Sequence, residues 1–250
     1  MHQSDQDGCA WPALDEPYQQ ALTEAVEYVF QRFEPVGLLV SGTIIRGNPG
    51  KASDLDITII HREPWRQRVQ KVFNGVPAEI FVNPREQIEQ YFEAERKQGR
   101  PVTAHMLATG FTIYDPDGVV KSLQVKARNV LAAGPEISPS TLTWRRYATA
   151  TWLEDAVDIA DSDPELCIAF LFRAVDEAVR YRFWDAGEWQ PRHKDLLRSL
   201  TELDPQLNEL VLAFHNSGVL ADCIECARQV LEHSVGETGF FEWESEIEPV

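Results

Sequence analysis

VSGTIIRGNPGKASDLDITII, residues 40–60, joins two apolar runs, at 37–40 and 57–60, that predict buried strands. The polar loop between the two runs ends in Ser-Asp-Leu-Asp. Side chains two residues apart point to the same side of a strand, so Asp54 and Asp56 are expected on one face. Two carboxylates so close together repel each other and need a counter-charge. Mg²⁺ would supply it, because this ion binds one or two carboxylates together with substrate phosphates.

The turn at the start of this stretch has the composition of an anion-binding loop. Gly42 and Thr43 offer backbone N–H groups and a hydroxyl, the donors that bind phosphates at helix N-termini. A phosphate loop and metal carboxylates would then be adjacent in one short segment. The simpler alternative is a turn glycine followed by two aspartates on a surface strand.

The whole string resembles the signature of the DNA polymerase β-type nucleotidyltransferase superfamily: Gly-Ser-x-x-x-Gly, a short loop, then Ser-Asp-x-Asp or Ser-Asp-x-Glu. The matching positions are Gly42, Arg46, Gly47, Ser53, Asp54 and Asp56, and Thr43 stands in the usual place of serine. The resemblance implies transfer of NMP from an NTP, with ATP as the expected donor, by two-metal in-line displacement. It implies that Asp54 and Asp56 hold Mg²⁺. The residues it implies for the triphosphate are Gly42, Thr43, Arg46 and Ser53.

A third carboxylate is expected on a separate strand. Residues 77–82, PAEIFV, predict that strand, and Glu79 is its only charged residue. A glutamate in an apolar strand commonly points to solvent at a sheet edge. The superfamily, however, carries its third carboxylate on a neighbouring strand, and the resemblance implies Glu79 for that role. Glu79 would ligate the second ion or act as the general base.

The rest of the pattern predicts an α+β protein, with a small mixed-sheet nucleotidyltransferase domain over 1–137 and an all-helical domain over 138–250. Residues 134–140, GPEISPS, are the expected linker. Residues 65–73 are expected to be helical or a connector. Further helices are expected at 17–33, 84–97, 102–109, 119–132, 141–160, 164–186, 192–203, 205–215 and 219–234, and a last strand at 111–114.

Over about 40–133 the order of elements resembles the aminoglycoside nucleotidyltransferases of the kanamycin-modifying type. That resemblance implies that the helical domain holds the acceptor and that Lys194, after the turn at 187–191, reaches the nucleotide phosphates; a solvated lysine is the alternative. It also implies an acceptor-side catalytic acid on the helix face of Glu154, Asp155 and Asp158, for which Asp158 is the candidate. A merely hydrated helix face is the alternative there, and Glu177 competes for the role. Whether Glu79 or a helical-domain acid is the general base stays open.

The net charge of the chain limits the class of acceptor molecule that is expected. The net charge is −17, and residues 138–250 carry 9 Lys and Arg against 22 Asp and Glu. This acidity disfavours nucleic acid and favours a small hydroxyl-bearing, cationic acceptor such as an aminoglycoside antibiotic. The alternatives are a transferase acting on RNA or protein, and a non-catalytic nucleotide-binding regulator or antitoxin-like protein.

The cellular setting is expected to be the cytoplasm. The sequence has no apolar run of membrane-spanning length, and MHQSDQDG does not read as a signal peptide. Four cysteines suit a reducing compartment, and Cys223 and Cys226 are interpreted as helix residues rather than as a Zn²⁺ site. No membrane partner is expected, and a homodimer is compatible with the sequence.

Overall fold

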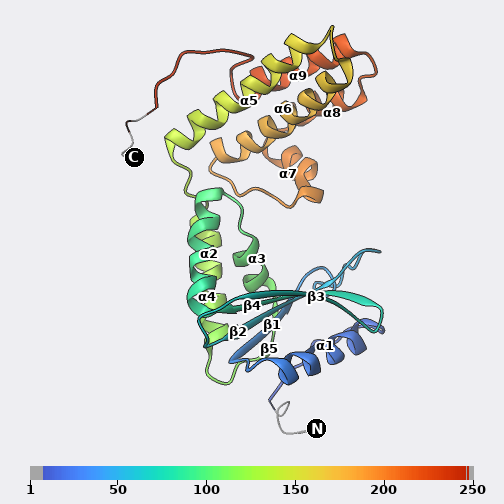
Figure 1. The fold of residues 1–250 in the computed structure, drawn as a ribbon, viewed down its shortest axis with the longest axis vertical. Helices are drawn as coiled ribbons and strands as arrows, with labels where there is room; N and C mark the ends of the chain where they lie inside the picture. Colours follow the sequence, from blue (N-terminus) through green and yellow to red (C-terminus); the bar gives the residue numbers. More distant parts are fainter. Residues whose placement is uncertain (1–7, 246, 248–250) are drawn as a thin grey trace. The chain divides into compact units, whose positions relative to one another are not determined.

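The computed structural model describes residues 8–245 and 247. The first part of the chain is built on a five-stranded mixed sheet with the order β3-β4-β2-β1-β5 (Figure 1). β2 and β4 are parallel, and the other neighbouring pairs are antiparallel. The strands are β1 (Gly37–Ser41), β2 (Leu55–His61), β3 (Gln67–Phe73), β4 (Val76–Pro84) and β5 (Phe111–Tyr114).

The two central strands are buried because helices cover both faces of the sheet. Helix α1 (Tyr18–Arg32) packs on β3 and β4, while α3 (Val102–Thr109) and α4 (Val119–Ala133) pack on β1. All five residues of β1 are buried, and Asp56 is the one residue of β2 that is not. Continuous apolar runs are the expected pattern for strands covered on both sides. Asp56 is therefore the one charged and incompletely buried residue of β2, which makes it a candidate site residue.

The expectation of a helix or connector at 65–73 is wrong, because Gln67–Phe73 forms the edge strand β3. The strand is mostly exposed and polar, so it lacks the apolar run by which the other strands were found. Asn74 and Gly75 form the turn that leads into β4, with φ of 43° and 77°. An Asn-Gly pair with both φ positive is the typical two-residue hairpin turn. In the sequence, this pair indicates a strand on either side of it.

In the second part of the chain, the regular elements among the described residues are all helices. It contains α5 (Pro139–Ile159), α6 (Pro164–Asp185), the short 3-10 helix η1 (His193–Asp195), α7 (Leu196–Leu203), α8 (Pro205–Asn216) and α9 (Leu220–Ser234). Three of these helices begin in the same way: the side chain of Ser138, Asp163 or Asp204 accepts a hydrogen bond from the backbone three residues on, and proline follows at once. Proline is well tolerated in the first turn, where its missing N–H is not needed.

Backbone contacts divide the chain into two compact units at Ala133 and Gly134, shortly before the predicted domain boundary after residue 137. Helix α2 (Arg85–Gln98) contributes to both, because Arg96–Arg100 groups with the helical unit. The α+β class, with a mixed sheet followed by a helical region, is confirmed. Within the described residues, the helices are too short or too polar to cross a membrane.

Candidate active site

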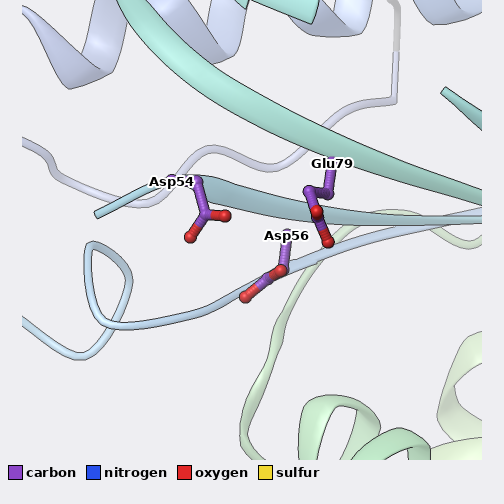
Figure 2. Close-up of side chains that lie close together, drawn as sticks. All are labelled: Asp54, Asp56 and Glu79. Carbon is purple, nitrogen blue, oxygen red and sulfur yellow. The ribbon is translucent and has the colours of Figure 1, made fainter. Parts of the chain in front are cut away.

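Three carboxylates converge at the end of β2 nearest the glycine loop. Asp54 immediately precedes β2, and Asp56 is its second residue. Glu79 lies on β4 directly beside Asp56, because the two strands are parallel and these residues are in register. One oxygen from each side chain lies within 4.8 Å of the others. Figure 2 shows the three side chains close together. Because β4 has a neighbour on each side, Glu79 does not lie on a sheet edge, so that alternative is wrong.

The negative charges of the three carboxylates repel one another. Partial burial is the largest cause, followed by the charges of Asp54 and Glu79, and together they raise the pKa of Asp56 to about 6 against the opposing charges of Arg46 and Arg68. A bound dication would relieve the repulsion and favour the ionised form. All three donors are carboxylate oxygens, the hard ligands that suit Mg²⁺. The residues present therefore fit a magnesium site.

Gly42 brings the first turn against these carboxylates. Its φ is 102°, a conformation that residues with a side chain rarely adopt. A Cβ atom at this position would lie 2.9 Å from Asp56 Oδ2 and 3.3 Å from the backbone oxygen of Asp54. The approach follows from the sheet, since Ser41 pairs with Asp56 across β1 and β2. Only glycine allows this turn to reach the carboxylates.

Two hydroxyl groups fix the loop that follows the glycine turn. Thr43 Oγ1 and Ser53 Oγ are 2.7 Å apart, and Ser53 Oγ accepts a hydrogen bond from the Gly50 N–H at 2.8 Å. The Asn48 N–H donates to the Thr43 carbonyl at 3.0 Å. These bonds place both hydroxyls, which are expected to bind phosphate, where the two ends of this loop meet.

The hydroxyl pair gives a testable series on Thr43. Thr43→Ala removes one hydrogen bond, so nucleotide affinity should fall by about 1 kcal/mol. Thr43→Ser keeps the hydroxyl and should be nearly silent, whereas Thr43→Val puts a methyl group in place of the hydroxyl, close to the phosphate position, and should be worst. Calorimetric titration with ATP and Mg²⁺ measures the series. Equal effects of all three substitutions would reduce Thr43 to a turn residue.

Glu79 has two further partners that sequence reasoning missed. Arg68 Nη2 donates to Glu79 Oε2, and Gln70 Nε2 donates to Glu79 Oε1. Both donors lie on β3, a strand that the sequence pattern does not predict. The Asn74-Gly75 hairpin signal was the sequence feature that would have placed them opposite Glu79.

The candidates from the helical unit lie on exposed surface. Asp158 is near the end of α5, with Glu154 and Asp155 exposed on the same helix, and Lys194 is exposed in η1. Their roles toward acceptor and nucleotide stay predictions. Glu177 is buried and already forms ion pairs with Arg173 at 2.6 Å and Arg145 at 3.8 Å. These ion pairs favour a structural role for Glu177 within the helical unit.

The raised pKa of Asp56 predicts a pH-dependent stability in metal-free protein. The folded state titrates this group near pH 6, whereas an unfolded aspartate titrates near about 3.9. Between those two pH values the folded state binds more protons than the unfolded state, so the free energy of unfolding falls as pH rises. Above about pH 6 it stays at this lower level. Asp56→Asn should therefore melt at a higher temperature than wild type at about pH 7.5, and the two should converge near about pH 4. Scanning calorimetry in a chelator measures this, and a difference independent of pH would contradict it.

A search of solved structures identifies a protein with the same fold. A nucleotidyltransferase-like protein from Exiguobacterium sibiricum 255-15 aligns with a TM-score of 0.54 and 13% identity, over 87% of this chain and 74% of that one. No family model matches the chain, and no curated protein matches it. At this identity the likeness shows that the two chains share a fold, and the narrower resemblance to aminoglycoside enzymes stays a prediction.

Proposed function

We propose that the protein is a Mg²⁺-dependent nucleotidyltransferase that moves NMP, from ATP, to a hydroxyl of a small cationic acceptor. The observation that carries the proposal is the convergence of Asp54, Asp56 and Glu79 beside the Gly42 turn. A surface cluster of acids would not need a glycine with positive φ packed against it. The fold of the solved nucleotidyltransferase-like protein supports the same class.

The carboxylates would hold two Mg²⁺ ions, which would supply charge neutralisation at the triphosphate and lower the pKa of the acceptor hydroxyl. The chain's own residues would orient the nucleotide. The Gly42 turn lies against Asp56 without a side chain, and Thr43 and Ser53 would bind a phosphate through the hydroxyl proton that their mutual hydrogen bond leaves free. Arg46, whose charge acts on Asp56, would stabilise the negative charge of the leaving pyrophosphate. Lys194 is the candidate for a second cation at the phosphates.

Two acids compete for the proton of the acceptor hydroxyl. Both oxygens of Glu79 already accept hydrogen bonds, from Arg68 and Gln70, and these bonds hold the carboxylate at the cluster with Asp54 and Asp56. This supports Glu79 as a metal ligand. Asp158, exposed on α5, is then the candidate for the general base.

The acceptor class rests on charge. The helical half of the sequence carries 22 acidic against 9 basic residues, a field that repels polyanions and attracts polycations. Exposed Glu154, Asp155 and Asp158 would add a local negative surface on α5. An aminoglycoside-like antibiotic meets these requirements with its several ammonium groups and hydroxyls.

The test is incubation with α-labelled NTPs, Mg²⁺ and a panel of aminoglycosides, lincosamides, tRNA and protein. Label should appear on a cationic small molecule and should decrease as salt rises. Asp158→Asn should reduce the transfer. Asp161→Asn, which removes the same charge just after α5, should leave it unchanged. Label only on tRNA or protein would overturn the acceptor class, and no transfer to any acceptor would overturn the activity.

A further inference from the structure

Two side chains of the edge strand β3 form hydrogen bonds with Glu79, the third carboxylate of the cluster. Gln70 is the residue opposite Glu79 in the antiparallel β3–β4 pair, and Arg68 is opposite Phe81, two residues further along β4. Residues two apart share a face, so all four side chains lie on the side of the sheet that carries Asp56. Arg68 and Gln70 each donate to a different oxygen of Glu79.

Arg68 is itself held in place by a second contact. Its guanidinium carbon lies 4.8 Å from the centroid of the Phe81 ring, within the range of a cation–π interaction. A guanidinium that stacks on a ring and donates to a carboxylate has little rotational freedom left. This distinguishes the pair from most exposed ion pairs, whose long side chains move freely and contribute little.

In the absence of a cation, Glu79 needs hydrogen-bond donors to keep its carboxylate beside Asp54 and Asp56. Asp54 and Asp56 are within a few ångströms and repel it, and nothing in a strand prevents a glutamate from turning away. With Arg68 on one oxygen and Gln70 on the other, the carboxylate stays at the cluster. Each carboxylate oxygen has two lone pairs, so each oxygen that accepts one hydrogen bond keeps a lone pair for a metal ion.

We propose that Arg68 and Gln70 are positioning residues that preset Glu79 as a metal ligand. The inference rests on the proposed function, because it concerns the same magnesium centre. The direction in which cation affinity changes when Arg68 is removed distinguishes a positioning role from a purely electrostatic one. If Arg68 acted only through its charge, removing it would make the site more negative and bind cations more tightly. If it orients Glu79, removing it weakens cation binding, as the loss of hydrogen-bond partners of metal ligands does, by about 10- to 100-fold.

The experiment is calorimetric titration of Mn²⁺ into protein saturated with a non-hydrolysable ATP analogue. Arg68→Ala should bind Mn²⁺ about 10- to 100-fold more weakly than wild type. Arg68→Lys, which keeps a cationic donor without the planar fork, should fall between the two. Gln70→Ala should lose less, because it removes a neutral donor. Lys71→Ala is the matched control: it removes the same charge from the same strand, where the ammonium lies 5.0 Å from the Tyr28 ring, and should bind like wild type.

The outcomes separate this inference from the proposed function. Wild type that binds neither Mn²⁺ nor nucleotide would overturn the magnesium centre and the positioning role with it. Wild type that binds Mn²⁺, together with an Arg68→Ala variant that binds as tightly or more tightly, would overturn the positioning role alone. If Arg68→Ala does not fold, Arg68→Lys and Gln70→Ala carry the test, and unchanged Mn²⁺ affinity in both would overturn it.

Discussion

Asp56→Asn is expected to abolish Mg²⁺-dependent nucleotide transfer while making the metal-free protein more stable at neutral pH. Asp56 is the central carboxylate, in register with Glu79 and against the Gly42 turn. Removing its charge takes away a metal ligand, and with it the stabilisation that the metal would give the transition state. That stabilisation is several kcal/mol of activation free energy, or about 10³-fold in rate. Asp54→Asn should act in the same direction. Transfer assays and ATP titrations with and without Mg²⁺ measure the loss.

The two opposite effects of Asp56→Asn make the result hard to confuse with misfolding. Burial and two neighbouring carboxylates raise the pKa of Asp56, so its charge costs the metal-free fold stability at neutral pH. The matched control is Asp115, whose two carboxylate oxygens each accept a backbone N–H at 2.9 Å at the start of α4. Asp115→Ala should lower stability by about 1 kcal/mol and leave the Mg²⁺ dependence intact. Equal ATP affinity with and without Mg²⁺ in both wild type and Asp56→Asn would contradict the metal assignment.

The centre of the site was predictable because its information is local. The apolar runs at 37–40 and 57–60, the loop between them and the spacing of Asp54 and Asp56 all lie within one short segment. Alternation along a strand then places side chains on a face without knowledge of the rest of the fold. Glu79 was harder, since its position beside Asp56 depends on which strands pair. That pairing came from the resemblance and not from periodicity.

The edge strand shows why the rest of the site was missed. Strand predictions depend on apolar side chains that face a core, and β3 has few because it is exposed. The polar residues of β3, Arg68 and Gln70 among them, make the segment look like a connector. Asp158 and Lys194 pose a different problem, because helical periodicity identifies an exposed face without indicating what that face binds. Their roles therefore depend on the transfer assay.

Gly42→Ala is expected to weaken nucleotide binding strongly, and Gly47→Ala is expected to spare most of it. Both glycines have positive φ, 102° and 77°, so an alanine at either position strains the backbone by about 1–2 kcal/mol. Only at Gly42 does the added Cβ also meet the site, 2.9 Å from Asp56 Oδ2, whereas nothing lies within 4 Å of a Cβ at Gly47.

The pair therefore separates backbone strain from occupation of the site. Thermal unfolding should show losses of similar order in both variants, with the larger loss at Gly42, where φ is less accessible to alanine. ATP titration with Mg²⁺ should show a loss of affinity of at least about tenfold for Gly42→Ala, because the turn must move away from Asp56 to relieve the contact, and a misplaced site loses binding steeply. If both variants keep wild-type affinity, the close approach of the turn to the carboxylates has no part in holding the nucleotide. If both lose it equally, the loop acts through its backbone conformation, and the contact with Asp56 is incidental.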